Sequence, residues 1–372
     1  MKTKLTLVTF LILFVAFNSC KKDPEVPKPE VLNPDEHEHV HHDTTPSSIT
    51  TGAFPIPNLA NDNKLTVEGV LLGRMLFYEK SLSQDNSISC SSCHNQSNGF
   101  SDSAKFSLGV NGSRGKRQAM AVFNMAWNSN GFFWDGRARL LRDQSLMPIQ
   151  DPLEMHETLP SVIAKLQTKH VYEHQFIKAF GSEEITSEKI SLALEQFMNS
   201  IVSTNSKFDQ SLAGTFTLTD SEERGRKLFF GEYNKYFPES SGAECSHCHA
   251  NITFENDLYM DNGLDSDASL TDIGREKVTQ KTSDRGKFKV PSLRNVAITA
   301  PYMHDGRFKT LEEVVDHYNT GLVASSHIDP ALENTRGTGL MLDAQEKADL
   351  INFLKTLTDE TFRTNPAYGN PF

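Results

Sequence analysis

Cysteine is scarce in this chain, and so are the features typical of membrane-spanning and sheet-rich proteins. Only five cysteines occur among 372 residues, and four of them lie in two short motifs. The apolar run from Leu5 to Phe17 is too short to span a bilayer comfortably. Alternation of apolar and polar residues is rare, which disfavours a sheet-rich fold. Basic residues are outnumbered, the net charge is −11 and no basic stripe is present, which argues against a nucleic-acid partner.

The four motif cysteines belong to two Cys-x-x-Cys-His sequences, Cys90-Ser-Ser-Cys93-His94 and Cys245-Ser-His-Cys248-His249. Two cysteines at this spacing can each form a thioether with one vinyl group of a haem, and the histidine that follows is placed to ligate the iron. We therefore predict two covalent haem c groups with His94 and His249 as iron ligands. Haem carries out one-electron and peroxide chemistry, for which the protein supplies ligands and electrostatics.

Zinc binding and disulfide formation are the alternative uses of such cysteine pairs. Structural zinc sites with four cysteine ligands usually place their pairs roughly 15–20 residues apart. Here the first pair ends at Cys93 and the second begins at Cys245, and each pair is followed at once by histidine. A thioredoxin-like redox pair needs a βαβ setting, which neither motif has. Covalent haem is therefore the favoured interpretation.

The N-terminus has the pattern of an exported and lipidated protein. A charged start, Met1-Lys2-Thr3-Lys4, precedes the short apolar run, which predicts a signal peptide over residues 1–19. Cys20 follows the small residue Ser19, as in a bacterial lipobox, so we expect Cys20 to carry a lipid. Covalent haem attachment is expected on the periplasmic side of a bacterial membrane, which agrees with export.

Residues 20–50 are rich in Pro, Glu, Lys and His and have no apolar periodicity. This composition predicts a disordered tether between the lipid and the folded part of the chain, and we expect membrane contact only through this anchor. The tether contains His37, His39, His41 and His42. Such a tract can bind metal, but a solvated polar tail is the more common reading.

The segments around the two motifs repeat in the same order. A Gly-Arg-x-Leu-Phe segment precedes each motif, and Asn-x-Ala and Asp-Gly-Arg segments follow it. The copies are Gly73–Phe77, Asn124–Ala126 and Trp134–Arg137 in the first half, and Gly225–Phe229, Asn295–Ala297 and His304–Arg307 in the second. An internal repeat in a chain of this length predicts two related domains, each with its own core. We expect a mainly α fold with cytochrome c-type domains at residues 51–212 and 213–372.

Helical signals agree with this fold class. Asp220 precedes Glu223 at capping-box spacing and predicts the start of the helix that contains Arg224–Phe230. Asp343 precedes Glu346 in the same way. Apolar stripes indicate a buried face on two helices, one with Ile190, Leu194, Phe197 and Ile201 and one with Leu350, Ile351, Leu354 and Leu357. The Gly-, Asp- and Ser-rich stretches 101–117 and 261–286 are typical of loops and are expected to wrap the haems.

With these motifs in place, the chain resembles the bacterial di-haem cytochrome c peroxidase family, which includes MauG. The resemblance spans roughly residues 65–360. It rests on Phe133-Trp134-Asp135-Gly136-Arg137-Ala138, similar to the segment that places a tryptophan between the haems, and on Pro291–Val296 with Thr299–Gly306, similar to the second-domain signature. In this family the N-terminal haem is peroxidatic and the C-terminal haem passes electrons.

The resemblance implies an open pocket at the first haem. Gln144 and Glu154 lie ten and twenty residues after Trp134 and match the family's distal glutamine and glutamate, and Pro148 matches a proline that crowds the same pocket. Cleavage of bound peroxide needs a base that takes one proton and returns it to the leaving oxygen, which suits Glu154. The amide of Gln144 can hold the oxygens by hydrogen bonds.

Two positions depart from the typical peroxidase. The family's blocking histidine stands sixteen residues after the first haem histidine, where this chain has Val110, so the first haem should be open without prior reduction. The family's methionine ligand of the second haem is replaced by Tyr318, as in MauG. A phenolate ligand stabilises ferric and higher states, whereas a thioether raises the potential. Met303 and His317 are the alternative ligands.

The resemblance also implies a calcium ion between the haems. The family uses backbone carbonyls at a Thr-x-Pro segment, here Thr299 and Pro301, and an asparagine that is replaced by Gln118 in this chain. The longer amide of Gln118 still offers a carbonyl oxygen, which suits a hard cation.

Three functions are open at this stage. The first is a periplasmic peroxidase that reduces hydrogen peroxide to water with electrons from a small donor protein, and the acidic surface would suit a positively charged donor. The second is a MauG-like oxidase that oxidises residues of a partner protein or another organic substrate. The third is a plain electron carrier, which Glu154, Gln144 and the missing sixth ligand disfavour. We expect the peroxidase and keep the oxidase as the alternative.

Overall fold

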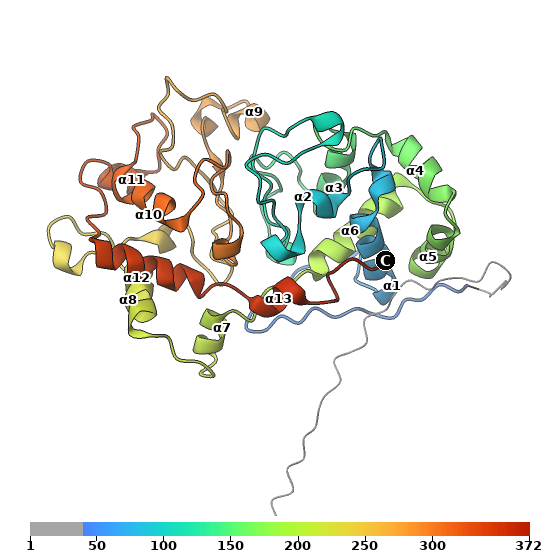
Figure 1. The fold of residues 1–372 in the computed structure, drawn as a ribbon, viewed down its shortest axis with the longest axis horizontal. Helices are drawn as coiled ribbons and strands as arrows, with labels where there is room; N and C mark the ends of the chain where they lie inside the picture. The colour runs from blue at the N-terminus through green and yellow to red at the C-terminus, as the bar shows by residue number, and fades with distance from the viewer. Residues whose placement is uncertain (1–39) are drawn as a thin grey trace, which may run out of the picture.

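The computed structural model describes residues 40–372, and the predicted signal peptide, Cys20, His37 and His39 lie outside this range. The described part is mainly helical, as predicted, and its only sheet pairs two short antiparallel strands. None of its helices has the length and apolarity needed to cross a membrane. Figure 1 shows two helical lobes side by side, one built from the first half of the chain and one from the second.

Helices from the two halves of the chain alternate with long irregular segments. The first half holds α1 (Val67–Tyr78), α2 (Cys90–Cys93), α3 (Leu141–Gln150), α4 (Leu159–Gln167), α5 (His170–Phe180), α6 (Ser187–Ser200) and α7 (Lys207–Leu212). The second half holds α8 (Asp220–Phe230), β1 (Tyr259–Met260), α9 (Glu276–Thr279), β2 (Phe288–Lys289), α10 (Leu311–Thr320), α11 (Pro330–Thr335), α12 (Ala344–Lys355) and α13 (Glu360–Thr364).

The helix starts follow local capping chemistry. The side chain of Asp343 accepts from the Glu346 backbone amide, and the Glu346 carboxylate accepts from the Asp343 backbone amide, as predicted for α12. The start predicted for α8 was wrong by one residue. Thr219 is its N-cap and forms the capping box with Glu222, because its extended backbone lets the hydroxyl reach the Glu222 amide. Asp220 is therefore the first helical residue, where its charge favours the helix dipole.

The internal repeat appears in the structure as two equivalent helix crossings. A Cβ atom on Gly73 would lie 1.9 Å from the Ala193 carbonyl oxygen, so α1 and α6 cross in backbone contact there. A Cβ atom on Gly225 would lie 1.9 Å from the Asp349 carbonyl oxygen, where α8 and α12 cross. Each crossing needs glycine because any side chain would separate the helices.

Two hydrophobic cores surround these crossings. The first core contains the predicted stripe of α6, with Ile190, Leu194, Phe197 and Ile201 all buried. The second contains the predicted stripe of α12, with Leu350, Ile351, Leu354 and Leu357 buried. Helix packing in both halves therefore follows the apolar periodicity of the sequence.

The cores divide the chain at different points from the expected boundary at 212/213. Phe208 of α7 packs in the second core, and Phe362 of α13 packs in the first. Beyond α13, the Arg74 side chain donates to the carbonyls of Pro366 and Gly369, both at 2.7 Å. Figure 1 shows the chain leaving α12 in the second lobe and ending against the first. The C-terminal segment therefore joins the two domains.

The end of the predicted tether is also attached to the first domain. The Ser47 amide donates to the Leu65 carbonyl at 3.0 Å, and the Val67 amide donates to the Thr45 carbonyl at 2.9 Å. The Asp43 amide donates to the Lys178 carbonyl at the end of α5. Residues 43–47 differ from the expected disorder because their backbone finds hydrogen-bond partners beside α1 and α5.

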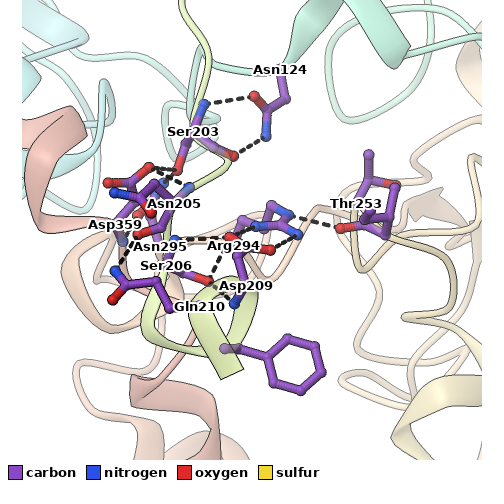
Figure 2. A network of polar contacts seen from close by, with 12 residues as sticks. Asn124, Ser203, Asn205, Ser206, Asp209, Gln210, Thr253, Arg294, Asn295 and Asp359 are labelled. Carbon is purple, nitrogen blue, oxygen red and sulfur yellow. Dashed lines mark hydrogen bonds and ion pairs between the residues drawn. The ribbon is translucent and has the colours of Figure 1, made fainter. Parts of the chain in front are cut away.

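A buried ion pair fixes α7 to the second domain. Arg294 is only 1% exposed, and its guanidinium makes two bonds to the Asp209 carboxylate, at 2.8 and 2.9 Å. The same guanidinium donates to the Ile252 carbonyl, three residues after His249. Figure 2 shows this pair at the centre of a polar network between the domains.

We predict that Asp209→Ala destabilises the folded protein by about 3–5 kcal/mol, because it leaves a buried guanidinium unpaired. The measurement is the free energy of unfolding from urea titration of the haem-loaded protein. The control is Asp316→Ala, since Asp316 makes an exposed ion pair with Lys347 that should be worth about 1 kcal/mol or less. An equal loss of unfolding free energy in the two variants would show that the buried pair stabilises the protein no more than the exposed one.

Candidate functional site

A large cavity joins the two Cys-x-x-Cys-His motifs. Its volume is about 1100 Å³, and its wall includes Cys93 and His94 from the first motif with Cys245, Cys248 and His249 from the second. This volume exceeds the ~300–1,000 Å³ of an ordinary small-molecule pocket. The cavity can therefore hold bulky groups at both motifs.

Each motif histidine is oriented in the same way. The Nδ1 atom of His94 lies 3.1 Å from the Phe100 carbonyl oxygen, and Nδ1 of His249 lies 3.2 Å from the Phe254 carbonyl oxygen. Phe100 and Phe254 share a φ of 55°, a region that bulky residues rarely adopt. A histidine that donates from Nδ1 to a carbonyl keeps Nε2 free as a metal ligand. Burial also lowers the pKa of His249 to about 4, which keeps its imidazole neutral for coordination.

The motif cysteines are unpaired thiols. Burial raises the pKa of Cys90 and of Cys245 to about 12, so both are held as neutral SH groups. All four motif cysteines are free of disulfides. No cluster of three or more His, Cys, Asp or Glu side chains suited to a metal ion occurs within residues 40–372, so the pairs do not meet in a shared zinc site. Free thiols beside an oriented histidine fit covalent haem at each motif.

The cavity wall beside the first motif gathers the residues predicted for peroxide chemistry. Gln144 and Pro148 reach it from α3, and Glu154 follows that helix in the loop. Burial raises the pKa of Glu154 to about 7; the nearby Asp151 adds to this and Arg137 opposes it. A carboxylate with this pKa can take up and release a proton near neutral pH.

Val110 stands where the typical peroxidase has a blocking histidine. Its side chain is buried, and its amide donates to the Glu154 carbonyl at 2.9 Å. Gly109 allows this approach, because a Cβ atom there would lie 2.1 Å from the Leu153 carbonyl oxygen. The loop is therefore packed against the backbone that carries Glu154, and it presents no iron ligand at position 110.

Tyr318 of α10 lies in the cavity wall beside the second motif. Burial raises the pKa of its phenol to about 12. The side-chain nitrogen of Asn262 lies 3.4 Å from the phenol oxygen. The alternative His317 has its Nε2 atom 3.0 Å from the Asn262 carbonyl oxygen, so its ring is engaged with backbone. Met303 also lines the cavity, with its sulfur 3.3 Å from the Asn262 amide. Tyr318 and Met303 thus both remain available to the second haem.

Trp134 stands where the two domains meet. Its indole nitrogen donates to the Gln118 carbonyl at 2.8 Å, which fixes the ring. Its ring lies edge-on to His304 of the second domain, with 6.5 Å between ring centroids, and His304 stacks on Phe288 at 3.7 Å. The indole therefore forms part of the cavity wall between the two motifs.

The residues expected to hold calcium line the same cavity. Gln118, Thr299 and Pro301 all contribute to its wall. The Gln118 side-chain nitrogen donates to Ser101 Oγ at 2.9 Å and to the Asp102 carbonyl at 3.2 Å. With the nitrogen fixed, the amide oxygen is left as the donor atom for a cation, so the set offers neutral oxygens that suit a hard cation.

Sequence reasoning missed several groups at the cavity. The Ser107 hydroxyl is buried in its wall beside Cys93, with which it interacts, and Met260 places its sulfur 3.3 Å from the sulfur of Cys248. Neither belongs to a motif. The carbonyls of Phe100 and Phe254 were missed as well, although the internal repeat could have shown that both motif histidines need an equivalent partner.

Two Cys-x-x-Cys-His motifs with oriented histidines in one large cavity define a protein that binds c-type haem at two sites. Comparison with known proteins agrees. The family model for the di-haem cytochrome c peroxidases matches residues 67–217. The chain is 34% identical over 298 residues to the methylamine utilization protein MauG of Methylophilus methylotrophus, covering 79% of this chain and 84% of that protein.

Other relatives carry both names found in this family. The cytochrome c551 peroxidase of Nitrosomonas europaea is 34% identical over 295 residues, covering 78% of this chain and 79% of that protein. The crystal structure of a MauG-like protein associated with microbial copper homeostasis matches with a TM-score of 0.78 and 34% identity, covering 86% of this chain and 97% of that one. The chain belongs to the di-haem cytochrome c peroxidase family, and it is an oxidoreductase of the peroxidase type.

Proposed function

We propose that this protein reduces hydrogen peroxide to water with electrons from a small periplasmic donor protein. The observation that carries the proposal is the wall beside the first motif, where Glu154 and Gln144 meet in the cavity while position 110 holds valine. The haem held by Cys90, Cys93 and His94 would supply the iron that binds and reduces peroxide.

The side chains around this pocket would manage the protons. Reduction of peroxide consumes two electrons and two protons and releases two waters. Glu154 would take the proton from the inner oxygen of peroxide and return it to the outer oxygen, which leaves as water. Its pKa of about 7 leaves a large fraction deprotonated at neutral pH. The Gln144 amide would hold the oxygens in place, and Pro148 would keep the pocket narrow.

The second motif would receive electrons from the donor. Cys245, Cys248 and His249 would hold the second haem, and Tyr318 is our proposed second ligand because it lines the cavity beside Cys248. Trp134, fixed between the domains, would lie on the path between the haems. Gln118, Thr299 and Pro301 would hold calcium through neutral oxygens. The Cys20 lipid would anchor the chain on the periplasmic side of the membrane.

A MauG-like oxidase is the second candidate. Two observations favour it, namely a tyrosine at the position of the second ligand and relatives that carry the name MauG. Such an enzyme would use the same pocket but would oxidise residues of a protein substrate. The two functions differ in what supplies the electrons, and a plain electron carrier would need neither Glu154 nor an open pocket.

We expect the fully oxidised protein to show one high-spin and one low-spin haem by electron paramagnetic resonance. The reason is Val110, which would offer the first iron no sixth ligand, whereas Tyr318 would supply one to the second iron. Val110→His should convert the high-spin signal to low-spin and slow the reaction with peroxide. The matched control is Val162→His, a buried valine of α4 that does not line the cavity. Two low-spin haems in the unaltered protein would contradict an enzyme active without prior reduction.

A further inference from the structure

The contacts between the two domains are reciprocal. Gln118 and Lys289 are equivalent in the internal repeat, since each lies six residues before the repeated asparagine. Trp134 and His304 are equivalent as well. The backbone amide of Gln118 donates to the His304 carbonyl at 2.8 Å, and the backbone amide of Lys289 donates to the Trp134 carbonyl at 2.7 Å. Exchange of equivalent contacts is the mark of a two-fold interface, so a local two-fold axis relates the domains.

The repeated asparagines obey the same symmetry. Asn124 and Asn295 both have left-handed backbones, with φ of 55° and 58°. The backbone amide of Asn124 donates to the Ile201 carbonyl at 2.9 Å, and the backbone amide of Asn295 donates to the Leu357 carbonyl at 3.0 Å. Each asparagine thus holds the chain that leaves the last core helix of its own domain, α6 in one case and α12 in the other.

Two residues further along, these chains meet each other. The Asn124 side chain accepts from the Ser203 amide, and the Asn295 side chain accepts from the Asp359 amide, both at 2.9 Å. Ser203 and Asp359 are therefore equivalent, and the Ser203 hydroxyl lies 3.3 Å from the Asp359 carboxylate. Figure 2 shows this meeting point of Asn124, Ser203, Asn295 and Asp359.

Equivalent residues that touch must lie on or near the two-fold axis. Two such pairs exist among these contacts, the rings of Trp134 and His304 and the side chains of Ser203 and Asp359. The first pair belongs to the cavity wall. The second pair lies beside the helix ends, and both of its residues are buried. The domains are thus held at two points along the axis, and the cavity for both haems lies across it.

At the second attachment the Asn205 backbone amide donates to the Asp359 carboxylate at 3.0 Å, and the Ser203 hydroxyl makes two further hydrogen bonds. It donates to Asp359 and accepts from the Asn295 side-chain amide at 2.9 Å, so both of its bonds go to the second half of the chain. The bonds of Ser203 to Asn124 use only backbone atoms of the serine. Removal of the hydroxyl therefore cuts links between the halves and leaves the first domain's own bonds in place.

We propose that Ser203, with Asn295 and Asp359, is a positioning residue that fixes the separation of the two haem domains and so sets the rate of electron transfer between the haems. The proposal rests on the proposed function only in requiring a haem at each motif. Ser203 touches neither peroxide nor the pocket of Glu154. Its effect is exerted through the position of one domain relative to the other.

The test is Ser203→Ala with electron transfer measured directly. A one-electron pulse is given to the oxidised protein without peroxide, and absorbance follows the electron as it equilibrates between the haems. We expect the rate to fall severalfold, because electron transfer between two fixed groups slows steeply as their separation grows. The potentials and spectra of both haems should stay unchanged, since no ligand is altered.

The matched control is Ser191→Ala, a buried serine of α6 whose hydroxyl bonds only to the Glu188 carbonyl of the same helix. It should lower stability slightly and leave the interhaem rate unchanged. Should Ser203→Ala fail to fold, Asp359→Asn removes the same carboxylate partner and should slow transfer likewise. The proposal would be overturned by an unchanged interhaem rate in Ser203→Ala, or by an equal fall of that rate in Ser191→Ala. Because no peroxide is used, an inactive peroxidase pocket would leave this result unaffected.

Discussion

Glu154→Gln should slow the cleavage of peroxide by about 10²–10⁴-fold, the usual contribution of a positioned acid–base group. The amide has nearly the shape of the carboxylate but cannot accept and return a proton. Both haem spectra should be unchanged, because Glu154 is not a ligand. Single-turnover mixing of the oxidised protein with peroxide, followed by absorbance, measures this step.

The pH dependence of the same step gives a second readout. Burial raises the pKa of Glu154 to about 7, so the base form is lost as pH falls through this value. The rate should rise with pH and level off above it, and Glu154→Gln should abolish the dependence. Asp143→Asn is the matched control, since Asp143 is an exposed carboxylate on α3 beside Gln144. If Glu154→Gln reacted with peroxide as fast as Asp143→Asn, Glu154 would not be the base.

Tyr318→Met should raise the potential of the second haem alone. We propose that the phenolate ligates this iron and favours its oxidised state, whereas a thioether favours the reduced state. The shift should be on the order of 100 mV, within the ~0.8 V that axial ligands span. The variant should accept an electron more readily and stabilise a doubly oxidised protein poorly. Redox titration of both haems, followed by addition of peroxide, measures the two effects.

Tyr302→Phe is the control for this experiment. Tyr302 also lines the cavity in the second domain, but its hydroxyl donates to the Val296 carbonyl at 2.9 Å. Its loss should leave both potentials in place, and the first haem should keep its spectrum in either variant. An unmoved second potential in Tyr318→Met would show that Tyr318 is not a ligand. Met303, whose sulfur also faces the cavity, would then be the candidate ligand, and the oxidase alternative would lose its main support.

The sequence was most informative where chemistry demands fixed spacing. The two motifs, the internal repeat and the capping box at Asp343 could all be read directly, because each depends on residues close together in the chain. Gln144 and Glu154 could be placed in the pocket only through the resemblance. Without it, Glu154 would have been taken for an ordinary surface acid.

Contacts between distant segments could not be predicted in this way. Nothing in the sequence of α13 indicates that Phe362 packs in the core of the first domain rather than the second. The meeting of Ser203 and Asp359 depends on how two finished domains dock, and no local pattern encodes that geometry. Similarly, the peptide carbonyls that orient His94 and His249 carry no side-chain signal.

We propose that the fully oxidised protein reduces peroxide with electrons from a donor protein and needs no prior reduction. The most direct test is steady-state turnover of the haem-loaded protein with hydrogen peroxide and a reduced small cytochrome. We expect two donor molecules to be oxidised for each peroxide consumed, without a lag and at the same rate with or without prior reduction. Consumption of peroxide that oxidises a protein substrate but leaves the donor reduced, or activity that appears only after reduction, would contradict it.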